Sequence, residues 1–297
     1  MQTDKRGALL VFGSAAVWSF GGAIARFLEV TDSWVMVFWR SVFAATFLLG
    51  FMLYRDGPVR TRQLFAAMGL PGLGVALCFA TASTSFVLAL SYTTVANVLL
   101  MQAGVPLLAA LLGFVLFREQ VSQATWAAIA CVIAGVAIMV SASLGGAVSP
   151  LGDGLALLIA VVFACATVIT RRHAEVGMMP AVCLGTLIAA LVSGSLVQHF
   201  AVSPKDFGLL FLFGAANLGL GMALFVSGAR LLPAALAALI GTAEPVLGPL
   251  WVWLVHGELP GLRTLLGGSV VFIALLAHLA WQFRQQSQQR VLPPGSV

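Results

Sequence analysis

Charge is scarce in this chain, and its scarcity excludes a water-soluble fold. Aspartate, glutamate, lysine and arginine make up 8% of the residues, whereas 61% of the residues are hydrophobic. A soluble domain carries about 25% charged residues. The chain has too little polar surface to cover itself in water, so we expect its solvent to be membrane lipid.

Lysine is nearly absent, which argues against a nucleic-acid partner. The net charge is +5, but Lys5 and Lys205 are the only two lysines in the sequence. Most arginines fall in short segments between apolar stretches, where positive charge reports membrane topology. We therefore expect no basic face and no nucleic-acid binding.

The few cysteines and histidines form no pattern typical of a metal site or a disulfide framework. The four cysteines lie inside apolar stretches, as buried small side chains often do, and the four histidines lie at the ends of such stretches. The chain also lacks a Walker A motif and any segment long enough for a soluble ATPase domain. We expect no metal, no cofactor and no direct use of ATP.

Ten apolar stretches are each close to the length of about 20 residues that crosses a bilayer. They cover residues 7–28, 33–54, 64–90, 94–117, 122–142, 152–171, 180–199, 206–229, 233–256 and 261–281. The third stretch is long and contains Pro71 and Gly74, so we expect a kink or break there. The first stretch resembles a signal peptide, but it is longer than a signal core and aligns with the sixth, so we expect it to be retained.

The distribution of positive charge predicts the topology. Eleven lysines and arginines fall on the side of the N-terminus, three fall on the opposite side, and one, Arg40, lies inside a stretch. The opposite side holds Arg26, Lys205 and Arg263. We predict a multi-pass protein of the cytoplasmic (inner) membrane with both termini in the cytoplasm.

One fragment of the sequence occurs twice. The spacing from Pro106 to Glu119 recurs as the spacing from Pro245 to Glu258, and an offset of 139 in the numbering relates the two copies. Each unit holds five stretches, an odd number, so the second unit must enter the membrane from the opposite side. Weak internal symmetry of this kind is a signature of transporter folds.

Upstream of this fragment the offset becomes 145, where Trp18 corresponds to Phe163 and Arg26 to Arg171. A six-residue difference in loop length explains the change. We divide the chain into a first five-helix repeat (1–146), a second, inverted five-helix repeat (147–284) and a disordered cytoplasmic tail (285–297).

This organisation resembles the drug/metabolite transporter superfamily, and its EamA-like family in particular. The resemblance covers about residues 7–281 and is carried by the paired proline and glutamate spacing in ten spans. It implies an all-α integral membrane fold, in which ten transmembrane helices form two inverted five-helix repeats around a central cavity. The fifth helix of each half is expected at the periphery.

The resemblance also indicates the kind of substrate. Members of the family move small metabolites, often outward, and several bacterial members export amino acids. The aromatic content and the size of this chain are similar to those of the aromatic amino-acid exporter subgroup. Sugar-phosphate carriers of the superfamily use basic residues in their pathway, and Arg40 is the one such residue here, which argues against a multiply phosphorylated substrate.

Glu244 is the leading candidate for a transport residue. It lies near the middle of the stretch 233–256, where an ionised carboxylate is costly unless it is paired or faces water. Pro245 removes a helix hydrogen bond beside it. Gly241 and Trp251 share its helical face, and a small residue beside a large ring suits a cavity wall. The alternative is a structural carboxyl group that satisfies the kink.

Three further polar residues lie inside stretches. Arg40, about 9 Å below the outer boundary, could bind a substrate carboxylate, snorkel to the interface or bond a carbonyl. Asn217 lies between glycines in a segment that could unwind and expose its backbone, or it could bond a neighbouring helix. Asn97 and Met101 share one helix face, and we place that face toward the cavity.

Aromatic residues complete the set. Trp18 lies in the middle of the first stretch, where its N–H needs a partner and its ring could line a cavity or pack. The predicted pathway residues are Trp18, Arg40, Phe79, Asn97, Met101, Phe163, Asn217, Glu244 and Trp251. Glu119 and Glu258 repeat at helix ends, so we interpret them as structural residues that cap a helix or bind loop amides.

Three classes of function come into question for a chain with these features. The first is a secondary transporter that exports small amphipathic metabolites, aromatic or neutral amino acids above all, by alternating access. A passive facilitator or channel is the alternative, although the chain has no repeated selectivity-filter segment. An intramembrane lipid-modifying enzyme would need clustered catalytic residues, so we expect no enzyme. The expected partners are a small-molecule substrate and membrane lipid, and we expect a monomer.

Overall fold

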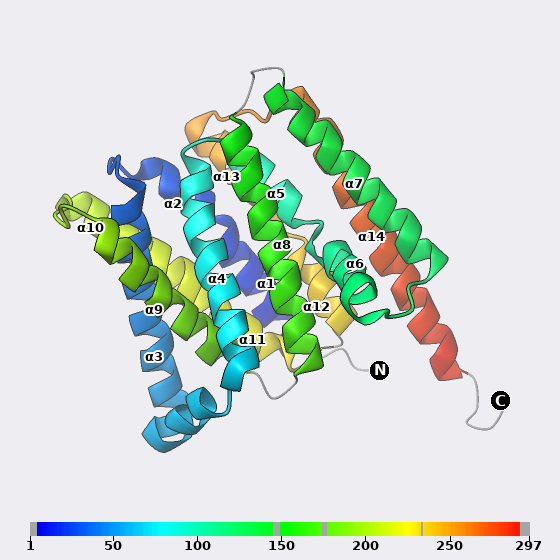
Figure 1. The fold of residues 1–297 in the computed structure, drawn as a ribbon, viewed down its shortest axis with the longest axis horizontal. Coiled ribbons are helices and arrows are strands. Elements are labelled where there is room, and N and C mark those ends of the chain that lie inside the picture. The colour runs from blue at the N-terminus through cyan, green and yellow to red at the C-terminus, as the bar shows by residue number, and fades with distance from the viewer. Residues whose placement is uncertain (1–4, 145–148, 174–176, 233, 292–297) are drawn as a thin grey trace.

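The computed structural model describes residues 5–144, 149–173, 177–232 and 234–291, and the regular elements in these ranges are helices (Figure 1). The first half contains α1 (Lys5–Ser19), α2 (Gly21–Phe27), α3 (Ser33–Ala66), α4 (Gly69–Leu90), α5 (Val95–Gln102), α6 (Val105–Phe117) and α7 (Gln123–Leu144). The second half contains α8 (Pro150–Arg172), α9 (Met178–Leu196), α10 (Pro204–Phe211), a π-helix (Leu212–Leu220), α11 (Gly221–Ala229), α12 (Ala234–Gly241), α13 (Glu244–His256) and α14 (Leu262–Val291).

The ten predicted spans are confirmed. Within the described residues, nine helical segments are long and apolar enough to cross a membrane, and the bent pair α5–α6, with 44° between its halves, is the tenth. An even number of spans puts the start of α1 and the end of α14 on one face. We call this face, which holds Lys5, the N-terminal face, and the other the opposite face.

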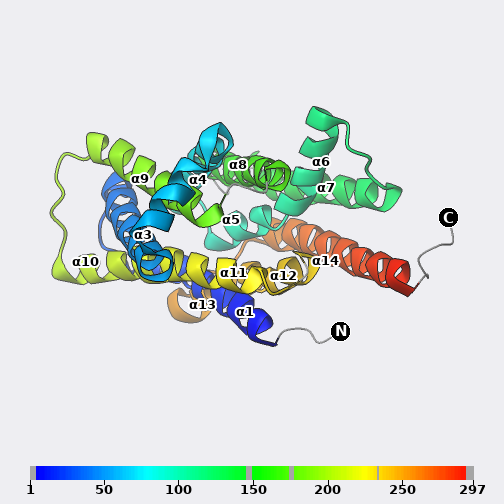
Figure 2. The same ribbon diagram turned by 90° about the horizontal axis from the view of Figure 1, so that it is seen from below.

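The packing of the helices follows a two-fold pattern. α1 packs along α11, and α8 packs along α4, so that the first span of each repeat lies against the third span of the other. α3 packs along α9, and α7 packs along α14, which pairs the second spans and the fifth spans. Figure 2 shows α3, α9 and α10 on one side of the molecule, and α7 with α14 on the other. Exchange of the two repeats preserves these pairs, as expected for inverted repeats.

The fourth span of each repeat is broken in the same place. α5 ends at Gln102 and α6 covers Val105–Phe117, whereas α12 ends at Gly241 and α13 covers Glu244–His256. Each of these boundaries is related to its counterpart by the offset of 139 that relates the two copies of the sequence fragment. The break precedes Pro106 and Pro245, which lack the N–H that a continuous helix would need. The repeat in the sequence is therefore a repeat in backbone structure.

Both broken spans end in a left-handed residue. Arg118 follows α6 with φ 53°, and Gly257 follows α13 with φ 66°. A left-handed residue after the last helical turn stops the helix and satisfies its final carbonyl groups. Arg118 is the single non-glycine residue with positive φ among those described. The left-handed residue reverses the chain, so that the next residue, Glu119 or Glu258, lies back against the protein.

The expected kink in the third span lies elsewhere. α3 continues to Ala66 through a non-helical Gly57, and α4 begins at Gly69, whose φ is 54°. Pro71 lies in the first turn of α4, where its missing N–H costs no helix hydrogen bond. The interruption expected near Pro71 and Gly74 therefore occurs before the proline, and α4 runs on to Leu90 without a break.

Two other boundaries differ from the sequence-based expectation. A turn at Phe20 divides the first span into α1 and α2. The last helix, α14, extends to Val291, so residues 285–291 are helical and not part of a disordered tail. Residues 292–297 lie outside the described part of the chain, as does the predicted repeat boundary at 146/147.

Candidate substrate pathway

Glu244 is the first residue of α13 and lies at the break in the ninth span. Its side chain is partly accessible, and within the described part of the chain its carboxylate has no hydrogen bond or ion pair. The turn at Thr242–Ala243 separates it from Gly241, so the continuous helical face expected to join Gly241 to Trp251 is interrupted. The equivalent position in the first repeat, at the start of α6, is occupied by Val105.

Arg40 is buried in α3, with 6% of its surface exposed. Its Nη1 donates to the hydroxyl of Ser83 on α4 at 2.7 Å, and its guanidinium lies 4.3 Å from the centre of the Phe213 ring. Its Nε has no hydrogen-bond partner in the described structure. The interpretation that Arg40 snorkels to the interface is therefore wrong, because the surrounding rings hold the guanidinium inside the protein.

Asn217 lies in the π-helix, which widens the eighth span by an i→i+5 backbone pattern. Its Nδ2 donates to the carbonyls of Val17 at 2.6 Å and Trp18 at 3.1 Å. These carbonyls lie at the end of α1, where the turn at Phe20 begins. Asn217 therefore forms hydrogen bonds to another helix. It connects the π-helix of the second repeat to the turn that divides the first span of the first repeat.

Trp18 and Trp251 lie on either side of the same turn. The Trp18 ring packs against Phe225 at 5.5 Å, and its indole N–H has no partner among the described residues. Trp251 Nε1 donates to the Ser19 hydroxyl at 3.0 Å, and the Trp251 ring stacks on Phe20 at 5.0 Å. The sequence predicts a hydrogen-bond partner for the Trp18 N–H. Among the described residues it is the Trp251 N–H that has a partner, and the Trp18 N–H has none.

Apolar pathway residues from several helices meet in the interior. Met101 is buried in a cluster with Val98, and Phe163 and Trp251 pack against that cluster. Phe163 also contacts Phe79, with ring centres 5.5 Å apart. The structure thereby brings together Met101, Phe163, Trp251 and Phe79, which come from both repeats.

Asn97 has a partner that the sequence reasoning missed. Its Nδ2 donates to the Thr93 hydroxyl at 3.1 Å and to a carboxylate oxygen of Asp153, in the first turn of α8. Asp153 is 3% exposed, so a charged residue lies buried at a helix start. Its position soon after Pro150 is typical of an aspartate at an exposed helix start. Only the packing of α5 on α8 shows that it is buried.

Two equivalent ion pairs connect the repeats, one at each face of the protein. Arg26 Nε lies 2.8 Å from Glu258 Oε2 at the opposite face, and Arg171 Nη2 lies 2.5 Å from Glu119 Oε2 at the N-terminal face. Glu258 Oε1 also accepts a hydrogen bond from the backbone N–H of Val95 at the start of α5, 2.9 Å away. This hydrogen bond is the one expected if Glu258 has a structural role and caps a helix start.

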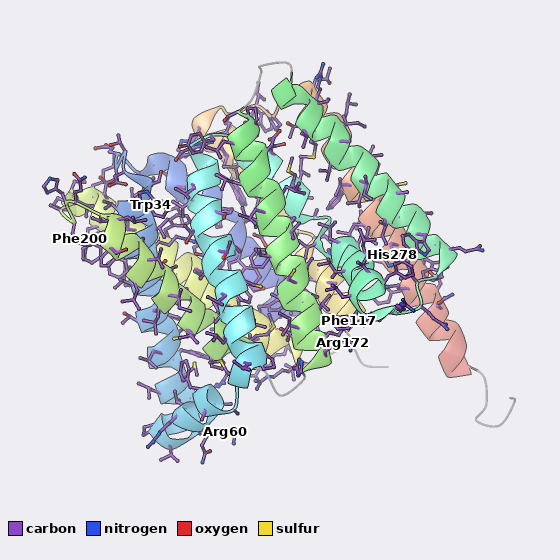
Figure 3. The ribbon with its side chains drawn as sticks, in the orientation of Figure 1. Trp34, Arg60, Phe117, Arg172, Phe200 and His278 are labelled. Atoms are coloured by element: carbon purple, nitrogen blue, oxygen red, sulfur yellow. The ribbon has the colours of Figure 1, made fainter. Side chains whose placement is uncertain are left out.

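The N-terminal face has one further contact of this group. Arg172 Nη2 lies 3.6 Å from Glu119 Oε1, and its guanidinium lies 3.5 Å from the centre of the Phe117 ring. Figure 3 labels Phe117 and Arg172 side by side near the lower end of α8. Glu119 is thus held by two arginines of the second repeat.

A cavity of about 690 Å³ opens at the opposite face, between the α2–α3 loop, the end of α9 and the start of α10. Its walls include Glu29, Trp34, His199 and Asp206. None of the nine predicted pathway residues lines it. Figure 3 labels Trp34 on this edge of the molecule. The cavity is therefore a surface feature separate from the predicted pathway.

These features define a class of protein: a multi-pass membrane carrier fold built from two inverted five-helix repeats, each with a proline-broken fourth span. The EamA-like transporter family matches residues 5–141 and 150–279, which together cover both repeats, and the chain belongs to this family. Members of this family are transporters, so the chain is a membrane transporter of small solutes. The EamA-like family, which the sequence resembles, is thereby confirmed as the family of this chain.

The fold has a counterpart among solved structures. A crystal structure described only as that of a protein matches the chain with a TM-score of 0.63 and 19% identity, over 95% of this chain and 99% of the other. At this identity the match shows a shared fold and nothing about substrate. A comparison with curated proteins finds no match.

Proposed function

We propose that the chain is a secondary transporter that exports small amphipathic metabolites, neutral and aromatic amino acids in particular, by alternating access. The observation that carries this proposal is the difference between the two breaks. The first repeat forms its break with Val105 at the position that Glu244 occupies in the second repeat. Because the break forms without a carboxylate, the backbone does not need Glu244, and its cost within the membrane points to transport.

The surroundings of the pathway residues support an amino-acid substrate. Arg40 keeps one donor, Nε, without a partner among the described residues, and a guanidinium binds carboxylates well. The cluster of Met101, Phe163 and Trp251 offers the apolar and aromatic walls that a neutral side chain needs. One arginine does not balance the several charges of a sugar phosphate.

The paired breaks also support alternating access. A span that is interrupted at the same place in each repeat can bend there without loss of helix hydrogen bonds elsewhere. The two ion pairs, one at each face, join the repeats where an opening would have to occur. In this proposal the two repeats rock about the interior cluster around Met101. Each face opens when the ion pair at that face breaks.

Counterflow in proteoliposomes tests the proposal. Vesicles loaded with unlabelled phenylalanine or leucine should take up the labelled amino acid transiently, and uptake should saturate. Robust counterflow of a sugar phosphate with none of an amino acid would overturn the substrate class. A flux that rises linearly with concentration and shows no counterflow would favour the passive channel instead.

A further inference from the structure

Asp153 and Asn97 form a buried polar pair at the opposite face. The two residues are 3% and 2% exposed. Asn97 Nδ2 donates to Asp153 Oδ1 and to the Thr93 hydroxyl. The two remaining oxygen atoms of the pair, Asp153 Oδ2 and Asn97 Oδ1, have no hydrogen-bond partner in the described structure. The pair therefore holds two buried acceptors and no donor for either.

The packing around the pair is close. A Cβ atom on Gly152 would lie 2.8 Å from the Thr93 Cβ and 3.0 Å from the Tyr92 carbonyl oxygen, so the first turn of α8 rests on the backbone between α4 and α5. A buried acceptor without a donor costs free energy, and more when it carries charge. Backbone atoms of Tyr92 and Gly152 are therefore packed closely beside the pair.

The charged groups at this end of α8 do not satisfy the carboxylate. Arg26 donates from Nη2 to the Thr93 carbonyl at 3.0 Å, but its guanidinium is paired with Glu258. Arg171 and Arg172 lie at the other end of α8, with Glu119. Tyr92, between α4 and α5, lies beside the first turn of α8 and approaches it through its backbone. Within the described structure, Asp153 therefore has no ion-pair partner.

Asp206 shows what a fully bonded aspartate looks like in the same molecule. It lies in the first turn of α10 and, like Asp153, is 3% exposed. Its Oδ1 accepts from the backbone N–H of Glu29 at 3.0 Å, and its Oδ2 accepts from the Ser203 hydroxyl at 3.0 Å. Burial at a helix start therefore does not by itself leave an oxygen unpaired, and Asp153 differs for a local reason.

We propose that Asp153 and Asn97 bind a small monovalent cation, Na⁺ or a proton, between Asp153 Oδ2 and Asn97 Oδ1. One carboxylate without an ion-pair partner balances one positive charge. Na⁺ would take both oxygens as ligands, as hard cations do. A proton on Oδ2 would donate to Asn97 Oδ1 and complete a carboxylic acid–carboxamide pair with two hydrogen bonds. The site is independent of the substrate proposal, because binding can be measured without transport.

The sodium arm of the test uses thermal unfolding of the purified protein in detergent. NaCl is exchanged for choline chloride at constant ionic strength and pH. If the cation is Na⁺, Tm should rise by about 5 °C when Na⁺ exceeds its dissociation constant a hundredfold. Asp153→Asn should abolish the rise, and Asp206→Asn, the matched control, should retain it.

The proton arm uses infrared absorption of the protein at neutral pH in Na⁺-free buffer. A protonated carboxyl group absorbs at a higher frequency than a carboxylate. If the cation is a proton, the wild type and Asp206→Asn should show a protonated carboxyl band that Asp153→Asn loses. Asn97→Ala should shift that band, because the acceptor of the proton is removed.

The wild-type protein alone can overturn the proposal, so it does not depend on whether a variant folds. A wild type whose Tm is indifferent to Na⁺, and whose spectrum lacks a protonated carboxyl band, would show that the site binds no cation. A Tm indifferent to Na⁺, together with a band that neither Asp153→Asn nor Asn97→Ala alters, would have the same meaning. Loss of amino-acid counterflow in the same preparation would bear on the proposed function and leave the cation site unaffected.

Discussion

Arg26 of the first repeat and Glu258 of the second form an ion pair that has a symmetry mate. The mate is Arg171 with Glu119, and the offsets of 145 and 139 that relate the repeats convert one pair into the other. In each pair the arginine ends the first span of one repeat, and the glutamate follows the broken fourth span of the other. Inversion places one pair at each face of the membrane. The two pairs are therefore equivalent contacts between the repeats, and we call them latches because the proposed alternating access requires each of them to break when its face opens.

The first prediction concerns the latch at the opposite face. Arg26 and Glu258 are about three-quarters buried, so their ion pair should contribute about 1–2 kcal/mol in a double-mutant cycle. We expect Glu258→Gln to lower stability and to raise labelling of a cysteine placed at Thr93 by an impermeant thiol reagent. The exchange Arg26→Glu with Glu258→Arg should recover part of the loss.

The exposed pair Lys205–Glu29 is the control for this cycle. Its side chains are 57% and 67% exposed, and exposed pairs couple weakly. Its coupling should be near zero when measured by the same unfolding assay. Equal coupling of the two pairs would show that Arg26–Glu258 is an ordinary surface contact and not a latch.

The second prediction concerns Glu244. Glu244→Gln keeps the side-chain volume and removes the negative charge, so gradient-driven accumulation should be lost while counterflow of unlabelled against labelled substrate survives. Glu29→Gln, on an exposed carboxylate, is the control and should behave as wild type. Both activities are measured in proteoliposomes with and without an imposed pH gradient. Accumulation by Glu244→Gln at the wild-type rate would assign the carboxylate to structure and favour a passive facilitator.

The third prediction concerns Arg40. Arg40→Lys keeps a positive charge, but it loses the planar donors and the contact with the Phe213 ring. We expect KM for an aromatic amino acid to rise about tenfold, which corresponds to about 1.4 kcal/mol, while KM for the matching decarboxylated amine changes little. Equal effects on the amino acid and the amine would show that Arg40 does not recognise the carboxylate.

The fourth prediction concerns topology. The excess of positive charge on the N-terminal side predicts cytoplasmic termini and an external loop at Lys205. In a cysteine-free variant, a cysteine placed at Lys205 should react with an impermeant thiol reagent in intact cells, whereas one placed at Arg60 should react only after the membrane is disrupted. The reverse pattern would invert the topology.

The span count, the inverted repeat and the interruption at Pro245 were predictable from the sequence, because each rests on local properties. About 20 apolar residues cross a bilayer whatever they pack against. Pro106 and Pro245 interrupt a helix through their own missing N–H. The boundary errors, at Phe20, Gly69 and Val291, fall where turn geometry and packing outweigh hydrophobicity.

The role of Glu244 could be argued from its depth, but its contrast with Val105 needed the comparison of the two breaks. The environment of Arg40 was open between three alternatives, and burial among Ser83 and Phe213 removed one of them. A sequence states how far a residue lies along its own helix. It does not state which neighbouring helix faces that residue.

Partner choice was decided by the tertiary structure alone. Asn97 and Asp153 are 56 residues apart, and Arg26 and Glu258 are 232 apart. No local pattern links residues at such separations, because their contact depends on how α5 meets α8 and α2 meets α13. The sequence by itself determined which segments enter the membrane and that a proline interrupts the ninth of them. The packing of the two repeats decided which polar groups are satisfied, and among the described residues it leaves Asp153 Oδ2 and Asn97 Oδ1 without a donor.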